Sequence, residues 1–428
     1  MNHQKIAART DYDVIVVGGG AAGLSVIASL LKRQPKLHIA LVEPATEHYY
    51  QPGWTLVGGG VFEQKSTIKP MEALIPAGVT WYKSAAASFL PEQNQIQLTD
   101  NNSLEYRSLI VATGLKLNWS AIAGLEGNLG RQGITSNYAP GLAPYTWQLA
   151  QQLRSGKALF TQPPMPIKCA GAPQKAMYLS CDHWQREQVL ASINVEFCTA
   201  GGALFGVADY VPALKGYVDK YGINVNYQTN LIGVDAERKV AVFRQTDTEG
   251  NSTEQEKPFD MLHITPPQVA PDVIAQSPLA DAAGWVDVFP DTLQHKTWAN
   301  IFGLGDCSNT PNAKTAAAVR KQAPVVAENV LSMLSGKPLR AVYDGYGSCP
   351  LTVERGKIVL AEFLYGGKVA PTFPLWLVDG TKASALSWLL KEKLLPPLYW
   401  HAMLKGREWL AAPKHQDDLP TDRHVKPS

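Results

Sequence analysis

Hydrophobic residues near the start of the chain form two short runs separated by a helical pattern. Residues 13–17 read DVIVV, which is typical of a buried parallel strand. The glycine-rich turn GGGAAG follows, and then SVIASLLKRQ, whose apolar positions recur at helical spacing. A second apolar run, residues 38–42, ends at Glu43. This order predicts a strand–turn–helix–strand unit of an α/β fold with a parallel sheet.

The turn in this unit has the glycine spacing of a dinucleotide-binding site. Gly18, Gly20 and Gly23 fit the pattern G-x-G-x-x-G, with Ala22 inside it, and Glu43 lies 20 residues beyond Gly23. The glycines allow a tight turn, close approach of the backbone to a pyrophosphate, and close packing of helix on strand. The helix N-terminus favours phosphate charge, and the carboxylate would accept ribose hydroxyls. We therefore expect a dinucleotide to bind here.

Two later strands end in turns that resemble those of flavoproteins with two dinucleotide-binding domains. The first reads LIVATG and contains Thr113 and Gly114. The second reads NIFGLGD, ends at Asp306, and precedes Lys314 and an alanine-rich helical stretch. The resemblance implies that both turns contact FAD and that the helix directs its N-terminus at the flavin, where reduction places negative charge. Lys314 would add a full positive charge at that end.

The middle of the chain lacks the second glycine motif that a pyridine nucleotide reductase of this kind would carry. The turn at the corresponding place, residues 166–175, reads PIKCAGAPQK, with one glycine followed by Pro173. Proline has no N–H to offer a phosphate, and its ring restricts the turn. We expect a second Rossmann-like frame that has lost its NAD fingerprint, does not use NAD(P)H, and carries Cys169 instead.

Composition and charge exclude several other classes of protein. The 428 residues suggest two or three domains, and a formal net charge of +2 gives no support to nucleic-acid binding. No apolar stretch is long enough to cross a bilayer, and no apolar leader is seen, so a cytoplasmic side is the default expectation. The five cysteines include no C-x-x-C pair, and no metal site is predicted.

Two of the five cysteines have surroundings suited to chemistry. Cys169 is expected between a strand and a helix, with Lys168 beside it and Lys175 nearby. Cations and a helix N-terminus lower the pKa of a thiol and favour the thiolate. Cys349 lies in the glycine- and proline-rich turn YDGYGSCP, ahead of a strand predicted at residues 357–363. The alternative role for each cysteine is that of a small buried packing residue.

A resemblance to the sulfide:quinone oxidoreductase family extends over nearly the whole chain and is strongest to the branch that includes the mitochondrial enzyme. It is carried by segments such as YYQPGWTLVGGG, PIKCAGAPQKAMYLS, GLGDCSNTPNAKTAAAV and YDGYGSCPL. In that family two cysteines form the redox centre on one face of the flavin, and the motifs place them at Cys169 and Cys349. The same matching assigns a non-covalent FAD to Gly18, Gly20, Ala22, Gly23, Glu43, Gln51, Thr113, Gly114, Asp306 and Lys314.

The resemblance also implies a reaction. A disulfide between Cys169 and Cys349, or a sulfur-bridged form, would be attacked by HS⁻, which gives a persulfide and a thiolate. Cys349 would hold the substrate sulfur and Cys169 would be the thiolate that reacts with the flavin. The implied partners are hydrogen sulfide, a ubiquinone-type quinone, and a sulfane-sulfur acceptor such as glutathione, sulfite, cyanide or a second sulfide. Lys168, Lys175 and Lys314 would attract HS⁻ and stabilise thiolate charge.

The C-terminal region, about residues 371–410, has the composition of a membrane-surface segment. It holds four of the eleven tryptophans, and its helical stretch ALSWLLKEKLL is followed by two prolines that should break it. Aromatic anchors with a positive bias suit a helix in the headgroup layer. We expect a peripheral membrane protein in which the quinone or lipid faces Phe363, Trp388, Tyr399 and Trp400. The alternative is a helix pair that caps the flavin domain.

These expectations divide the chain into three parts. Residues 1–158 and 291–340 would form the FAD-binding domain, residues 159–290 the second Rossmann-like domain, and residues 341–428 a C-terminal region with a polar tail. Three other functions share some of the motifs: an FAD-dependent NADH:quinone reductase, a flavocytochrome-type sulfide dehydrogenase subunit, and a flavin-binding protein without turnover. The cysteine pair, the lost NAD fingerprint and the C-terminal composition favour sulfide:quinone oxidoreduction over these.

Overall fold

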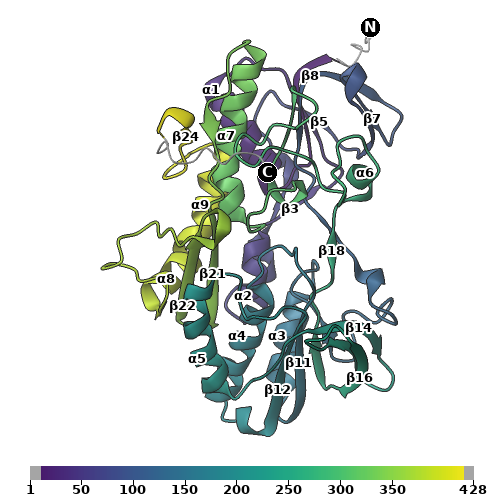
Figure 1. Ribbon diagram of the computed structural model, residues 1–428, viewed down its shortest axis with the longest axis vertical. Coiled ribbons are helices and arrows are strands. Elements are labelled where there is room, and N and C mark those ends of the chain that lie inside the picture. The colour runs from purple at the N-terminus through teal and green to yellow at the C-terminus, as the bar shows by residue number, and fades with distance from the viewer. Residues whose placement is uncertain (1–10, 419–428) are drawn as a thin grey trace, which may run out of the picture.

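The first two predicted strands lie at the centre of a sheet in the upper lobe of Figure 1. The computed structural model describes residues 11–418. Four of the strand pairings in this sheet are parallel and two are antiparallel. In spatial order they are β5 (Thr80–Tyr82), β2 (Ile39–Val42), β1 (Asp11–Val17), β8 (Ser103–Val111), β7 (Gln95–Leu98) and β6 (Ala86–Leu90), and β19 (Ile301–Gly303) also pairs with β8.

Two long helices, α1 (Ala21–Arg33) and α7 (Ala316–Leu334), pack against each other beside this sheet (Figure 1). Every residue of β2 is buried, as expected for a parallel strand that is covered on both faces. The carboxyl ends of β1, β2, β8 and β19 share one edge of the sheet. The turns that carried the sequence motifs therefore meet there, at the position where open α/β sheets bind ligands.

The lower lobe holds a second parallel sheet, with the order β10 (Ile134–Thr135), β17 (Met261–His263), β11 (Gly156–Gln162), β12 (Ile193–Thr199) and β13 (Asn224–Asn226). The helices of this lobe are α3 (Ala143–Gln152), α4 (Ala172–Arg186) and α5 (Val211–Tyr221). The predicted α/β fold with Rossmann-like sheets is confirmed. β10 belongs to the second sheet through its pairing with β17, although it precedes the expected boundary at residue 158.

Short elements complete these two lobes. An antiparallel sheet at the side of the lower lobe consists of β14 (Thr229–Asp235), β15 (Val240–Thr246) and β16 (Ser252–Pro258). The other short elements are β3 (Glu47–Tyr49), β4 (Ile68–Pro70), β9 (Lys116–Leu117), β18 (Gln268–Val269), α2 (Trp54–Gly58) and α6 (Asp272–Ala275).

The C-terminal region begins with an antiparallel sheet beside α4, formed by β21 (Gly347–Glu354), β22 (Lys357–Phe363) and β23 (Ala383–Ser384). One continuous helical segment follows, with α8 (Ala385–Leu389), a π-helical turn (Leu390–Leu394) and α9 (Leu395–His401).

The break expected at Pro396 and Pro397 is therefore wrong, because the helical segment continues through both prolines to His401, with the π-helical turn directly before them. Within residues 11–418 no helix is long and apolar enough to cross a membrane.

Part of the expected polar tail is ordered. β24 (Lys414–His415) pairs with β20 (Ala341–Val342), and the remainder of the tail, residues 419–428, lies outside the described residues.

Candidate active site at Cys169 and Cys349

The turn after β1 has the backbone geometry of a dinucleotide site. Gly18 has φ +105°, and a Cβ added at Gly18 or Gly23 would collide with backbone oxygens, so both positions require glycine. A Cβ added at Gly20 would meet nothing within 4 Å, which leaves this face of the turn open where α1 begins. Glu43 Oε2 accepts a hydrogen bond from Gly19 N at 2.6 Å, so the acid after β2 also fixes the turn.

The turns after β8 and β19 bring the other expected FAD residues to the same edge. The Thr113 hydroxyl is buried and has no hydrogen-bond partner among the described residues, and an added Cβ at Gly114 would meet open space. Ala22 is buried against the turn at Gly305. Lys314 Nζ donates to the Asp306 carbonyl at 2.7 Å. A buried hydroxyl without a partner, together with open space at Gly20 and Gly114, fits a polar cofactor such as FAD at this edge.

The two sulfurs singled out in the sequence lie side by side. Cys169 Sγ and Cys349 Sγ are 3.5 Å apart, although 180 residues separate them along the chain. Cys169 has φ +48°, a strained conformation for a residue with a side chain. Its N–H donates to the Lys314 carbonyl at 2.9 Å, so the cysteine turn of the lower lobe is hydrogen-bonded to the segment that leads into α7.

Cys349 lies in a strand and not in the turn expected from the sequence. It is part of β21, where it pairs with Ala361 of β22. Pro350 is tolerated in the next position because β21 is an edge strand of its sheet, so the missing N–H costs no ladder hydrogen bond. The strand holds the Cys349 side chain in a buried position, 2 % exposed.

A buried lysine makes the two cysteines chemically different. Lys175, in the first turns of α4, is 2 % exposed, and its Nζ donates to Cys169 Sγ at 3.0 Å. The hydrogen bond from the Cys349 thiol, together with this ammonium, holds the pKa of Cys169 well below its usual range despite burial. The same hydrogen bond and burial raise the pKa of Cys349 well above that of a free thiol. The surroundings of Cys169 therefore favour the thiolate more than those of Cys349 do.

Lys168, unlike Lys175, donates its side-chain hydrogen bond to a residue other than a cysteine. Its Nζ donates to Gln51 Oε1 at 2.7 Å, which ties the cysteine turn to a residue expected to bind FAD. Burial lowers the pKa of Lys168 to about 8, against the opposing influence of Asp306 and of Cys169. Lys168 is thus a cation between the two sites and makes no direct contact with a cysteine sulfur in any hydrogen bond of the described residues.

The sequence analysis missed a third lysine at the sulfur site. Lys391, in the π-helical turn, is 5 % exposed, and its Nζ lies 3.4 Å from the carbonyl oxygen of Pro350, next to Cys349. Burial and then the nearby charge of Lys175 lower the pKa of Lys391 to about 7, while both cysteine sulfurs oppose this. π-helical turns recur at functional sites. In the sequence Lys391 is one of three consecutive charged residues, KEK, and nothing local indicates which of them points inward.

Curated relatives resemble the chain over most of its length. It is 41% identical over 400 residues to the mitochondrial sulfide:quinone oxidoreductase of Mus musculus, covering 93% of this chain and 88% of the relative. It is 42% identical over 397 residues to the mitochondrial sulfide:quinone oxidoreductase of Dictyostelium discoideum, covering 92% and 86%. The chain belongs to the sulfide:quinone oxidoreductase family. The names of both relatives are mitochondrial and give no support to the cytoplasmic side expected from the sequence.

Two broader comparisons agree with the fold. The pyridine nucleotide-disulphide oxidoreductase family matches residues 12–156. The structure of the sulfide:quinone oxidoreductase from Aquifex aeolicus superposes with a TM-score of 0.75 at 19% identity, covering 92% of each chain. Both comparisons therefore agree with the two-lobed α/β fold described above.

Three of the four aromatic residues expected to face quinone or lipid are buried in the protein. Tyr399 and Trp400 are 5 % and 6 % exposed, and they pack against Tyr50 in the first lobe. Phe363 is buried against Phe205. These three side chains pack inside the protein and are not exposed to lipid, and their place beside a quinone stays a prediction.

Trp388 is half-buried, and its indole N–H donates to Glu392 at 2.8 Å. The exposed apolar side chains of this region are instead Leu375, Trp376, Leu377, Leu386, Leu389, Leu394, Trp409 and Leu410.

Proposed function

We propose that this protein is a sulfide:quinone oxidoreductase that oxidises hydrogen sulfide at Cys169 and Cys349. The observation that carries the proposal is the 3.5 Å approach of these two sulfurs beside the buried Lys175 ammonium. Two adjacent cysteines, one of them partly exposed and with surroundings that favour the thiolate, form an arrangement suited to thiol–disulfide exchange. A passive flavin-binding protein or an NADH:quinone reductase needs no such pair, and residues 166–175 lack the second glycine motif of an NAD(P)H-dependent reductase.

The sulfur step balances with the residues present. HS⁻ attacks the Cys349 sulfur of a Cys169–Cys349 disulfide, the S–S bond breaks, and Cys169 leaves as a thiolate while Cys349 becomes a persulfide. A nucleophilic acceptor, such as glutathione, sulfite, cyanide or sulfide, then removes the outer sulfur and leaves a Cys349 thiolate. Reoxidation of the two thiolates to the disulfide releases two electrons. Lys175 stabilises the leaving thiolate, and Lys391 adds positive charge on the Cys349 side.

The FAD site would use the edge where the strand ends meet. Gly18, Gly20 and Gly23 would surround the pyrophosphate, Glu43 would accept ribose hydroxyls, and Thr113 would offer its unpartnered hydroxyl. The remaining contacts would come from Ala22, Gln51, Gly114, Asp306 and Lys314. FAD bound without a covalent link would accept the two electrons from the thiolates and deliver them to a ubiquinone-type quinone.

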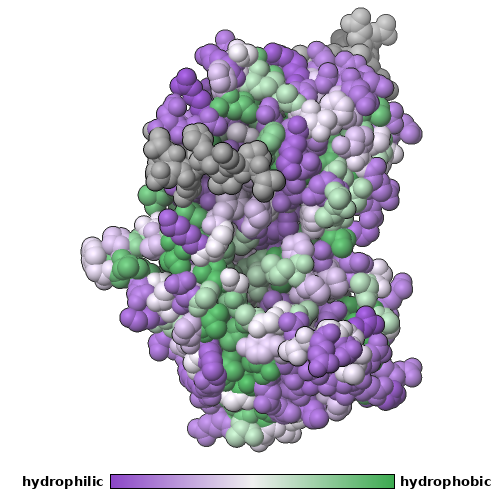
Figure 2. Space-filling model, in the orientation of Figure 1, coloured by the Kyte–Doolittle hydropathy of each residue, from purple (hydrophilic) through white to green (hydrophobic). Residues whose placement is uncertain are grey.

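Membrane attachment would use the apolar side chains exposed on the C-terminal region. Trp376 is 85 % exposed, and Leu386, Leu389 and Leu394 direct apolar surface outward from the helical segment. Figure 2 shows green side chains along the left edge of the molecule, where α8, α9 and the preceding loop lie in Figure 1. Such a surface suits insertion into the headgroup layer, from which a lipid-soluble quinone could enter.

The proposal is tested by removing each sulfur separately. Cys169→Ser and Cys349→Ser should bind FAD as the wild type does and lose sulfide oxidation by about a thousandfold or more, because each leaves no disulfide to attack. The double variant should lose no more than either single variant, since the two residues act as a unit. Steady-state quinone reduction with sulfide measures this. Full activity in either single variant would remove that cysteine from the mechanism.

A further inference from the structure

The buried aromatic residues of α9 are connected to the dinucleotide turn by hydrogen bonds. Tyr399 and His48 Nε2 are 2.7 Å apart, and His48 Nδ1 lies 3.2 Å from the Gly19 carbonyl oxygen. A carbonyl only accepts, so Nδ1 carries the hydrogen, and Nε2 accepts from the Tyr399 hydroxyl. Burial lowers the pKa of His48 to about 4, which keeps the ring neutral. Gly19 N in turn donates to Glu43, so the chain of contacts reaches the expected ribose site.

Aromatic packing makes this connection rigid. The rings of Tyr50 and Tyr399 are 4.8 Å apart, and the ring of Trp400 lies 5.7 Å from that of His48 in an edge-to-face arrangement. The ammonium of Lys69, in β4, lies 4.6 Å from the centre of the Trp400 ring. Pairs of this kind stabilise beyond the area that they bury. α9 therefore contacts the segment that follows the dinucleotide motif on several sides.

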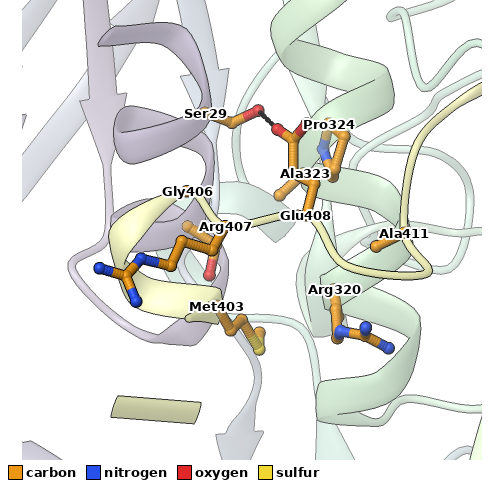
Figure 3. A pocket seen from close by; sticks show the side chains of 10 residues that line it. Ser29, Arg320, Ala323, Pro324, Met403, Gly406, Arg407, Glu408 and Ala411 are labelled. Carbon is orange, nitrogen blue, oxygen red and sulfur yellow. Dashed lines mark hydrogen bonds between the residues drawn. The ribbon is translucent and has the colours of Figure 1, made fainter. Parts of the chain in front are cut away.

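The chain after α9 contacts α1, the helix that begins at the same turn. Glu408 accepts a hydrogen bond from Ser29 at 2.6 Å (Figure 3). It also accepts one from Arg33 at 2.5 Å. Gly406 has φ +68°, and a Cβ added there would lie 2.7 Å from the Ala28 carbonyl oxygen, so this residue must be glycine for the chain to lie so close to the helix.

We propose that residues 395–411, which we call the C-terminal clamp, hold the Gly19 turn and α1 in the conformation that binds FAD. This rests on the proposed FAD site. The clamp is linked to the Gly19 turn through Tyr399 and His48, and it contacts α1, beyond the motif, through Glu408. By thermodynamic linkage, FAD must stabilise the docked clamp by the same factor as the docked clamp strengthens FAD binding. Tyr399 is a positioning residue for the cofactor.

Tyr399→Phe tests this assignment, because it keeps the ring and removes only the hydroxyl. His48 Nε2 loses its donor in a buried site, and we expect FAD to dissociate about tenfold faster. Tyr221→Phe is the matched control, since Tyr221 is equally buried and donates to the Val353 carbonyl at 3.2 Å in the lower lobe. FAD release is followed by the rise in flavin fluorescence on dilution of the purified full-length protein.

Limited proteolysis supplies the reciprocal readout. In the wild type, FAD should slow cleavage within residues 402–418, and Tyr399→Phe should reduce this protection by the same factor as it weakens binding. FAD release within twofold of the wild type, or a loss equal to that of Tyr221→Phe, would overturn the inference. If the wild type bound no FAD, the proposed function would fail. If the wild type bound FAD and Tyr399→Phe released it at the wild-type rate, only the role of the C-terminal clamp would fail. Thermal unfolding of both apo variants checks that they are folded.

Discussion

At the residue scale, the function depends on how a buried sulfur carries negative charge. Burial opposes a thiolate, and the protein offsets this with hydrogen bonds and cations placed within a few ångströms of Cys169. Lys175 supplies the direct contact, and its pKa is raised by the two sulfurs although burial works against it. Lys391 lies farther away, beside Pro350, and has no carboxylate partner in any ion pair of the described residues.

Removal of the Lys391 charge should make the ionised form of Cys169 less stable relative to the neutral thiol. In Lys391→Met we expect the pKa of Cys169 in the reduced protein to rise by about one unit, because a nearby positive charge stabilises the ionised thiol. The rate of iodoacetamide labelling of Cys169 as a function of pH measures that pKa without FAD or quinone.

Lys393→Met is the matched control for this test, since Lys393 is exposed and pairs with Glu392 at the surface. Equal labelling profiles in the Lys391 and Lys393 variants would show that Lys391 does not act on the sulfur.

The sequence predicts that lysines close to Cys169 along the chain lie near its sulfur. It does not predict that a lysine far along the chain packs against the same site. Cys169 and Lys175 lie within one turn–helix segment, so their proximity follows from local structure. Lys391 belongs to a stretch whose composition indicates a membrane-surface helix. Its inward direction depends on the packing of α8 against β22, which no local pattern encodes.

At the scale of elements, the site depends on how closely the start of α4 approaches β21. Gly171 lies immediately before α4, and a Cβ added there would overlap Leu351 and lie 2.9 Å from Cys349 Sγ. Helix and strand can be this close only because the position has no side chain. The distance between the two sulfurs is therefore set by this contact between the lobe and the C-terminal sheet.

Gly171→Ala should separate the sulfurs while leaving the FAD site intact. We expect sulfide-dependent turnover to fall at least about tenfold, since an ångström-scale misplacement of reacting groups is costly, with FAD content unchanged. Gly216→Ala in α5 is the control, because a Cβ added there meets nothing within 4 Å. Wild-type turnover in Gly171→Ala would indicate that β21 can shift to accommodate the added Cβ without disturbing the reaction.

Element boundaries illustrate why propensity was an incomplete guide. The strand at residues 357–363 was predicted and is present as β22, whereas Cys349 and Pro350 were assigned to a turn and lie in β21. Pairing with β22 outweighs the local preference of a glycine- and proline-rich sequence. Likewise, the helical segment continues through Pro396 and Pro397, although local preference would end it there.

At the scale of the whole molecule, the exposed apolar side chains lie mainly on one part of the surface. They cluster on the loop after β22, on the outward face of α8 and after α9. Trp376→Ser combined with Leu389→Ser should reduce binding to lipid vesicles by about tenfold or more, because both apolar groups would lose burial. Reduction of the flavin by sulfide should remain as in the wild type.

A control for lipid binding is Phe289→Ser, which removes another exposed aromatic side chain, 43 % exposed, from a different part of the chain. Its vesicle binding should match the wild type, as measured by co-sedimentation. Unchanged binding in the double variant would place the membrane contact elsewhere.

The arrangement of the two lobes and the C-terminal sheet explains which parts of the candidate site could be predicted from the sequence. Each FAD motif occupies the end of a parallel strand, and such ends meet at one sheet edge in any fold of this class, so their convergence was predictable. The cysteine pair needs a contact between the lower lobe and the C-terminal sheet, and was expected only through resemblance to the family. The contact of Tyr399 with His48 joins residues 351 positions apart and had no sequence signal.

The central claim is that electrons enter this protein from sulfide through Cys169 and Cys349. The most direct measurement is the anaerobic addition of sulfide, and separately of NADH, to the FAD-loaded protein while the absorbance of the oxidised flavin is recorded. We expect sulfide to bleach the flavin of the wild type but not that of Cys169→Ser, and we expect NADH to have no effect on either. Flavin that stays oxidised in the presence of sulfide, or that is bleached by NADH, would contradict it.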